Sequence, residues 1–493
     1  MVPRALGAST YPAPMHVVDY TLFGLYLCGM LAIGARFFRG SASEEDYFLG
    51  GRTMNPTHIG LSVVATDVGG GFSIGLGGLG FAIGIAGSWM LFSGLVGAWL
   101  SAVLLIPRLH PLSRRLRFLT FPDLIRHAYG STAALLAGLI SAAGYLGFTA
   151  SQLLAGAKLS TAVFPSVSLP TSLAVMGVIV VAYTVLGGLK AVVFTDTIQW
   201  IILLGGLSLV GIPAAYLAIG GWEGIVAVLP PAHFSLWSID LVTFVNWMIT
   251  IVPIWFVAMT LYQRIYACRS GADAQRAWYV AGLFEWPIMA FLGVGLGLMA
   301  RVAAAQGRFA ALGFATPDAM DPEMGLPLLL STSLPIGVAG ILLAAYFSAI
   351  MSTADSCLLA ASGNTTSDLL AKLGLLPRKT EHASRLVTLI LGLVAILLAS
   401  QMTSVLDVML SSYAFMISGL LVPVAFAFRA KRATPYAAVL SMLVGGSTTL
   451  LLQTNPPAPL LALGLDANAY GLVMSLLVFV AIDRRKIPPH PRP

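Results

Sequence analysis

Residues 61–78 read LSVVATDVGGGFSIGLGG, an apolar segment that carries one carboxylate, Asp67, and three consecutive glycines at 69–71. If this segment crosses a membrane, each glycine weakens the helix by about 1 kcal/mol relative to alanine. The carboxylate adds at least ~2.5 kcal/mol near the middle of the bilayer. Close helix packing is the ordinary reason for glycines in membrane helices, but packing leaves Asp67 without a role. The pattern therefore favours a discontinuous helix that lines a polar cavity.

An unwound segment near 66–71 exposes backbone groups that can bind ligands. The carbonyls of Ala65 and Val68 become free to coordinate a cation, and Asp67 faces water, an ion or a cationic group. The N–H groups at the start of the second half-helix lie at its positive end, where an anionic group of a solute binds favourably. These donors belong to Gly70, Gly71 and Phe72.

A second polar run, AAYFSAIMSTADSCLLAASGNTTSD, covers residues 344–368. Ser352 and Thr353 follow Ala349 at helical spacing, so one carbonyl and two hydroxyls share a helix face. A neighbouring stripe consists of Ser352, Asp355 and Ser356. Hydroxyls in membrane helices often bond back to their own backbone, which is the structural alternative. Two stripes with a carboxylate favour an ion site, and hard oxygen ligands without a soft donor suit sodium.

The composition identifies the elements that must position these groups. The chain has 493 residues, of which 58% are hydrophobic and 10% charged, whereas a soluble protein carries about 25% charged residues. We therefore expect an integral membrane protein. The three cysteines show no metal-ligand spacing and are expected to be buried hydrophobes; they are Cys28, Cys268 and Cys357.

The apolar runs predict thirteen membrane-spanning segments, all helical, because an unpaired backbone is prohibitively costly in lipid. The predicted spans are 17–38, 55–82, 86–107, 131–164, 170–188, 192–220, 240–268, 272–304, 333–371, 381–401, 404–428, 433–453 and 463–482.

The loop charges predict the orientation of these spans. All but four of the 27 Lys and Arg residues, including Arg264, are assigned to loops after odd-numbered spans or to the C-terminal tail. By the positive-inside rule the N-terminus is outside and the C-terminus cytoplasmic. The basic charge is thus a topology signal and does not call for nucleic acid. The outward segment 305–332, with Asp318, Asp321 and Glu323, is expected either to cap the entrance or to be a solvated linker. The four exceptions are Arg4, Lys158, Arg301 and Arg308.

Three motifs occur in order: YTVLGGLKAVVFTDTIQW at 183–200, YQRIYA at 262–267 and MSTADS at 351–356. With them, nearly the whole chain resembles the sodium/solute symporter family. The resemblance implies a LeuT-type 5+5 inverted repeat with one extra helix before it and two after it. Pro253 is expected to interrupt span 7 as the glycines interrupt span 2. The implied divisions are 1–54, 55–220 (spans 2–6), 221–430 (spans 7–11) and 431–493.

The resemblance also implies ion-binding residues. The common sodium site falls on the carbonyls of Ala65, Val68 and Ala349 and on the hydroxyls of Ser352 and Thr353. A second sodium site falls on Asp196, Ser352 and Ser356, with Asp355 where a hydroxyl is frequent. Asp196 could instead have a structural role, as the ion-pair partner of Lys190 or of a nearby arginine. Sugar carriers of the family have Asn where Asp67 stands, whereas the proline-symporter branch has an aspartate.

The solute pocket implied by the resemblance is lined by spans 2, 3, 4, 7, 8 and 11, although core packing explains each aromatic equally well. Glu285 and Asp407 are intramembrane acids and functional candidates by default. No intramembrane arginine is expected to clamp a carboxylate, which favours a zwitterionic or amine-bearing solute. The candidates are Asp67, Gly70, Gly71, Phe72, Ser88, Phe148, Thr149, Gln152, Trp255, Phe256, Glu285 and Tyr413.

These observations predict sodium-coupled symport of a small polar solute, such as an amino acid, into the cell across the inner (plasma) membrane. Alternatives are sodium-coupled uptake of choline, betaine, a carboxylate or a sugar, a transporter-like sensor, or a uniporter or channel. An enzyme is not expected, because the seven histidines are dispersed and form no catalytic pattern. The partners are sodium, the solute and the lipid bilayer, with no nucleic acid, and the monomer is expected to function alone.

Overall fold

The computed structural model describes residues 16–38, 48–52, 54–67, 69–164, 166–332, 334–376, 381–428, 434–457 and 463–483. Within these ranges the chain is helical throughout, and its one strand-like feature is an isolated bridge between Met54 and Cys268. The predicted all-helical class is confirmed. The first-half helices are α1 (Val17–Phe38), α3 (Pro56–Asp67), α4 (Gly70–Ile83), α5 (Trp89–Leu104), α6 (Ile106–Leu116), α7 (Pro122–Tyr129), α8 (Ser131–Val163), α9 (Leu169–Gly205), α10 (Ile212–Ala218) and α11 (Gly221–Val226).

The second half continues the same architecture, with π-helical segments η5 (Phe284–Met289) and η8 (Asn364–Leu370) inside long helices. Its helices are α12 (Leu241–Val257), α13 (Met259–Ala267), α14 (Gly271–Leu283), α15 (Ala290–Ala305), α16 (Pro322–Thr332), α17 (Val338–Gly363), α18 (Glu381–Ala399), α19 (Val405–Ala427), α20 (Pro435–Thr454) and α22 (Ala467–Asp483).

Eight helical segments of the described chain are long and apolar enough to cross a membrane, and the bent pair of α12 and α13 makes a ninth. Several helices agree with predicted spans to within a few residues, among them α1, α8, α18, α19 and α20. The predicted spans 170–188 and 192–220 are not separated by a loop, because α9 continues through the π-helical segment η3 (Gly206–Gly211) into α10. The total of thirteen therefore stays a prediction.

In the described part of the chain, three interruptions of helices lie inside predicted spans, and one of them is the non-helical backbone at Trp286 in η5. The other two bear on the broken spans that the pattern predicted. α3 ends at Asp67 and α4 begins at Gly70, as the glycines predicted. The second break is not at Pro253, which lies inside α12; it is at Ala258, where the chain turns extended and bends by 43° into α13. The interruption expected at Pro253 is wrong in position, because a helix can continue past a proline when neighbouring groups satisfy the freed carbonyl.

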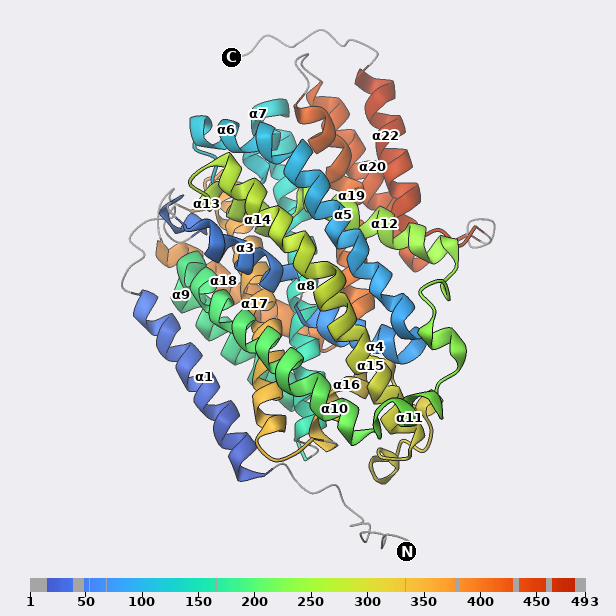
Figure 1. Cartoon of the computed structure of the whole chain (residues 1–493). Coiled ribbons are helices and arrows are strands. Elements are labelled where there is room, and N and C mark those ends of the chain that lie inside the picture. The colour runs from blue at the N-terminus through green and yellow to red at the C-terminus, as the bar shows by residue number, and fades with distance from the viewer. Residues whose placement is uncertain are drawn as a thin grey trace, which may run out of the picture.

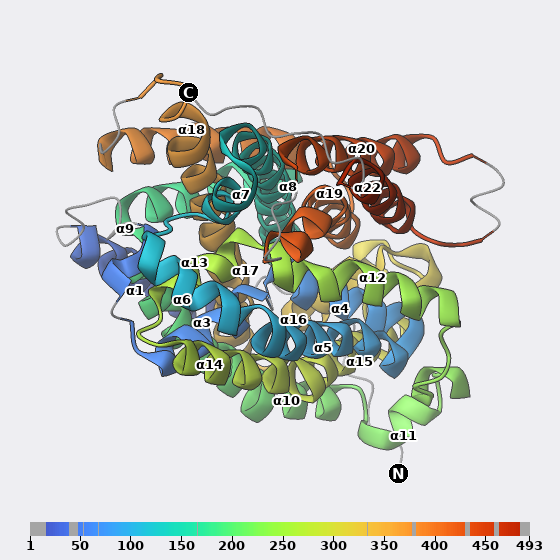
Figure 2. The same ribbon diagram turned by 90° about the horizontal axis from the view of Figure 1, so that it is seen from above.

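The helices form one bundle whose long axis is vertical in Figure 1, with α1 beginning at the lower end and α22 ending at the upper end. In the view along that axis, α17 lies in the middle and the pair α20–α22 lies on one side (Figure 2). α17 packs against α1, α3, α8, α9 and α18, and almost all of its side chains are buried. Of the three cysteines, Cys268 and Cys357 are buried as expected, but Cys28 on α1 is exposed.

Glycines allow α4 to approach α15 closely. A Cβ on Gly80 would collide with the backbone of Val294, and a Cβ on Gly297 would collide with the backbone of Gly77. Small residues at such a contact are the usual solution in membrane proteins. The glycines of the LSVVATDVGGGFSIGLGG segment therefore divide into two groups: Gly77 belongs to helix packing, whereas the glycines at 69–71 lie at the break.

Candidate functional site

The break between α3 and α4 is the point at which groups from several helices meet. Gly69 has φ −45° and ψ −170°, outside the helical region, so the chain unwinds there. A Cβ on Gly69 would collide with the side chain of Thr353 on α17, which explains why this position needs a glycine. Val68 and the side chains of Asp67 and Phe72 lie outside the described part of the chain.

The hydroxyl of Thr353 lies among three backbone carbonyls. Its Oγ1 donates to the carbonyl of Thr66 at 2.9 Å, and it lies 3.3 Å from the carbonyl oxygens of both Ala65 and Ala349. One hydroxyl has one hydrogen to donate, so the remaining oxygen lone pairs are available to a cation. The structure thus brings together Ala65, Ala349 and Thr353 as predicted, and adds the carbonyl of Thr66, which sequence reasoning did not single out.

Ser352, next to Thr353, donates its hydroxyl hydrogen to Asp196 Oδ1 at 2.5 Å. Both residues are fully buried, on α17 and α9. A hydroxyl whose hydrogen is accepted by a carboxylate keeps its oxygen lone pairs free, and such an outer partner makes the oxygen a better metal ligand. Asp196 therefore orients Ser352 and does not simply lie beside it.

Arg264 on α13 is the residue that sequence reasoning misplaced. It was assigned to a loop, but its side chain is fully buried and pairs with Asp196 Oδ2 at 3.2 Å. The bend at Ala258 redirects α13 into the bundle and carries the guanidinium with it. The alternative role of Asp196 as an arginine's ion-pair partner is the one observed. The motif YQRIYA contains this arginine. The sequence therefore marked the residue, but it did not show that the side chain is buried beside Asp196.

Asp355 and Ser356 complete the polar cluster around Asp196. Ser356 Oγ lies 3.2 Å from Thr66 Oγ1. Asp355 is fully buried, and its carboxylate oxygens make no well-formed hydrogen bond to another side chain or backbone group within the described ranges. The cluster brings together the four residues of the predicted second sodium site, with Arg264 among them.

Among the predicted solute residues, Gln152 on α8 lies at the break. Side chains on Gly69, Gly70 or Gly71 would each meet its amide group. Gln152 is fully buried, and its Oε1 has no hydrogen-bond partner among the described residues. An amide with a free acceptor beside exposed backbone donors is suited to bind a small polar molecule.

Two aromatic rings lie nearby, since Phe148 on α8 and Tyr413 on α19 meet edge to face with 5.0 Å between their centroids. Thr149 donates its hydroxyl to the carbonyl of Tyr145 on its own helix at 2.8 Å. Its hydrogen is therefore already used within α8.

Other predicted solute residues contact a different part of the bundle. Trp255 packs on Gly97 of α5 and meets Trp278 edge to face at 6.4 Å. Glu285, in η5, contacts Gly94 of α5. These contacts join α5, α12 and α14 and do not involve the break. The half-buried Phe256 accepts a hydrogen bond from Tyr262 at its carbonyl, 2.8 Å, and Ser88 is buried without a partner for its hydroxyl among the described groups.

Asp407 lies within a helix that is long and apolar enough to cross a membrane, so its position inside the membrane stays a prediction. It is exposed in the first turn of α19, where its backbone N–H donates to Ser404 Oγ at 3.2 Å. An acid in the first turn is stabilised by the helix dipole, so Asp407 belongs to the helix end.

A cluster of ion pairs lies near the C-terminal end of α8. Lys158 pairs with Asp321 at 2.7 Å and with Glu323 at 2.6 Å. Glu323 also accepts hydrogen bonds from the backbone N–H groups of Val405 and Leu406 at the start of α19. The segment around Glu323 is therefore packed on the bundle, and whether 305–332 caps the entrance stays a prediction.

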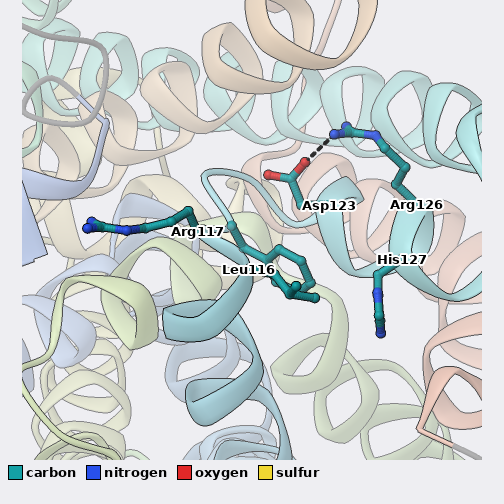
Figure 3. A pocket seen from close by; sticks show the side chains of 6 residues that line it. Leu116, Arg117, Asp123, Arg126 and His127 are labelled. Atoms are coloured by element: carbon teal, nitrogen blue, oxygen red, sulfur yellow. Dashed lines mark ion pairs between the residues drawn. The ribbon is translucent and has the colours of Figure 1, made fainter.

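At the other end of the bundle, α6, α7 and the turn between them line an open hollow of about 250 Å³. In Figure 3, Arg126 reaches Asp123, with which it forms an ion pair of 2.7 Å, while Arg117 points away from that pair. No residue of the break lines this hollow, so it is separate from the candidate site. Its lining residues are Leu116, Arg117, Phe118, Asp123, Arg126 and His127.

Comparisons with known proteins find similarity along most of the chain. The family model described as Sodium:solute symporter family matches residues 47–445. The high-affinity proline transporter PutP of Bacillus subtilis (strain 168) is 27% identical over 434 residues, covering 86% of this chain and 89% of that protein. The sodium/proline symporter of Escherichia coli (strain K12) is 28% identical over 446 residues, covering 87% and 86%.

The fold is shared with a solved structure of a Na⁺-coupled sialic acid symporter in a substrate-bound outward-open state. The TM-score is 0.78 at 21% identity, and the match covers 96% of this chain and 98% of that one.

Proposed function

This chain belongs to the sodium:solute symporter family, and from that premise we propose how it holds its ion and its solute. It is a multi-pass membrane protein of the plasma membrane that carries a solute together with sodium, and it acts as a transporter and not as an enzyme.

We propose that sodium binds where the broken helix meets α17. Its ligands are the carbonyls of Ala65, Val68 and Ala349 and the hydroxyls of Ser352 and Thr353. The observation that carries this proposal is the position of Thr353 Oγ1, within 2.9–3.3 Å of carbonyls from both helices. Neutral oxygens that already face one another need little rearrangement to enclose a small cation.

Sodium at this position would connect α3 to α17 and so couple ion binding to movement. The ion draws the carbonyls at the end of α3 towards the hydroxyls of α17, and this fixes the adjoining start of α4, where the solute binds. Each ligand then raises the affinity of the other by the same factor. Release of the ion lets the two helices separate, and the solute site opens to the other side.

The proposed solute is an amino acid, with proline as the first compound to test because relatives are named as proline transporters. Its carboxylate would lie against the N–H groups of Gly70 and Gly71, at the positive end of α4. Its amino group would face Asp67, and Gln152 would donate to or accept from its polar atoms. Less direct candidates are Phe72, Phe148, Thr149, Trp255, Phe256, Glu285 and Tyr413.

The finer description of the fold is also a proposal. We propose thirteen spans, with the first repeat in 55–220 and the second in 221–430, the N-terminus outside and the C-terminus cytoplasmic. The basic residues of α6 and α7 support this orientation, because they gather at the end where α22 finishes (Figure 1). We also propose that a single copy of the chain suffices for transport.

The test is uptake into proteoliposomes that contain the purified protein. An inward sodium gradient should drive accumulation of radiolabelled L-proline, and replacing sodium by choline should abolish it. Competition by other amino acids, betaines, sugars and carboxylates then ranks the solutes. Accumulation of proline that is equal with and without sodium would contradict the proposal. Sodium-driven uptake of another class of solute would retain the ion site and change the solute.

A further inference from the structure

The hollow between α6 and α7 has no part in the proposed transport site, and its lining is suited to an anion. Two guanidinium groups and an imidazole line it, together with two apolar side chains and one carboxylate. The surrounding segment 106–127 contains five arginines and one aspartate. Arginine is over-represented at phosphate sites, because its planar guanidinium donates two parallel hydrogen bonds. The composition of the hollow therefore favours a ligand that carries a phosphate.

The acids at the wall of the hollow already face basic side chains of the protein. Asp123 pairs with Arg126 at 2.7 Å, and Arg126 also reaches Asp368 of η8 at 3.1 Å. Lys372 pairs with Asp368 at 2.5 Å. Two carboxylates are thus matched by two cations, and Arg117 adds a further positive charge to the lining. In Figure 3 its side chain points away from the pair of Asp123 and Arg126.

The turn that carries Arg117 is held by hydrogen bonds and by packing. Arg117 takes the left-handed conformation, with φ 54° and ψ 44°, at the point where α6 ends. Asp123 Oδ2 accepts hydrogen bonds from the backbone N–H groups of Leu119 and Thr120, at 2.8 and 3.1 Å. Phe118 is buried in the turn, and its ring meets an aromatic ring of α13 at 6.2 Å. The backbone at Arg117 is therefore fixed before a ligand arrives, which lowers the ordering cost of binding.

The hollow lies at one surface of the membrane, because the connection that forms it joins two segments able to span the bilayer. α6 follows the apolar segment Ile74–Leu104, α7 precedes α8, and both segments are long enough to cross a membrane. Leu116 at the rim is 39% exposed, next to the exposed Arg117. A basic and an apolar side chain at one rim match the boundary between lipid headgroups and acyl chains. In the proposed orientation this surface is the cytoplasmic one.

We infer that the hollow binds the phosphate of an anionic phospholipid headgroup. Arg117 donates to the phosphate oxygens, while Arg126 and His127 form the wall behind them. Leu116 contacts the first carbons of an acyl chain. A lipid is the expected source of the phosphate, because the hollow is open at the membrane surface and has an apolar rim, neither of which a free phosphate ion requires. The bound lipid lies beside the ion pair that joins α7 to η8, at the end of α17.

The experiment is native mass spectrometry of the purified full chain in detergent, titrated with anionic dioleoylphosphatidylglycerol and, separately, with zwitterionic dioleoylphosphatidylcholine. One phosphatidylglycerol molecule should bind at least about tenfold more tightly than phosphatidylcholine, as expected for hydrogen bonds to charged groups. R117Q should weaken phosphatidylglycerol binding by about tenfold or more. R115Q is the matched control, because Arg115 is also exposed on α6 but does not line the hollow. It should weaken binding by at most about fivefold, the share of one charge in a delocalised surface attraction.

Equal losses in R117Q and R115Q would overturn the inference, because they would show attraction to the basic surface as a whole. Equal affinity of the parent protein for the two lipids would overturn it as well. Inorganic phosphate is the competitor that separates the sources: displacement of phosphatidylglycerol by an equal concentration of phosphate would assign the hollow to the free ion and refute the lipid.

A second measurement needs no substitution and so does not depend on whether R117Q folds. A photoactivatable phosphatidylglycerol should crosslink to peptides within 106–130, and crosslinks confined to other segments would refute the site. Both measurements are made without sodium or solute, so their outcome is independent of the proposed function.

Discussion

Replacing Thr353 with alanine removes the hydroxyl that lies within 2.9–3.3 Å of the carbonyls of Ala65, Thr66 and Ala349. A hydrogen-bond-like contact to a charged group contributes about 1.5–3 kcal/mol, whereas an ordinary neutral hydrogen bond contributes about 1 kcal/mol. The substitution removes the contact with sodium from the ion-bound state, which costs the larger amount of free energy. In the ion-free state it removes only a neutral hydrogen bond, which costs the smaller amount. The net loss of about 0.5–2 kcal/mol corresponds to a roughly 2- to 30-fold weaker affinity for sodium.

The assay is the sodium concentration that gives half-maximal proline uptake, measured beside direct ²²Na⁺ binding. Thr353→Ser is the matched control, since it retains Oγ and removes only a methyl group; its sodium requirement should stay close to that of the parent. The thermal unfolding of both variants should be compared, so that a folding defect is not read as weaker binding. A Thr353→Ala variant with the parent's sodium dependence would refute the site, whatever its maximal rate.

Three further results are expected. Lys158→Met leaves the buried Glu323 without its cation and should lower the free energy of unfolding by about 3–5 kcal/mol, seen as a lower melting temperature; an unchanged melting temperature would show that the pair is not needed. Gln152→Ala should raise the KM for solute while the sodium requirement remains that of the parent, and equal shifts in both would place Gln152 at the ion. Gly297→Ala forces a Cβ against the backbone of Gly77 and should cost about 1–3 kcal/mol of stability; full yield and stability would contradict the close contact of α4 and α15.

Local patterns were sufficient to find the elements of the ion site. Each of the consecutive glycines weakens a helix by about 1 kcal/mol relative to alanine, so a break near residues 69–71 could be predicted from the sequence, although Gly70 and Gly71 themselves lie in the first turn of α4. Helical spacing alone places Ala349 and Thr353 on one face of α17. The long apolar runs required helices, and the described chain is helical. Each of these properties depends on neighbours within a turn or two.

Contacts between residues far apart in the chain could not be predicted from the sequence. Arg264 looks like a loop charge because it follows an apolar run, yet a bend at Ala258 buries it. Asp407 looks like an acid that faces the interior of the bundle because apolar residues flank it, yet its side chain is exposed at the start of α19. In both cases the same local composition suits two environments, and a helix boundary or a bend of a few residues decides between them.

The sequence by itself determined that this chain is a helical membrane protein with a broken second span and a hydroxyl-bearing helix to pair with it, because those properties follow from residue type and spacing. Only the tertiary structure decided which groups contact the oxygens of Thr353 and Asp196. It placed Thr353 against the carbonyls of α3 and Arg264 beside Asp196. Contacts between residues about 70 to nearly 300 positions apart depend on how whole helices pack, and no local pattern encodes that packing.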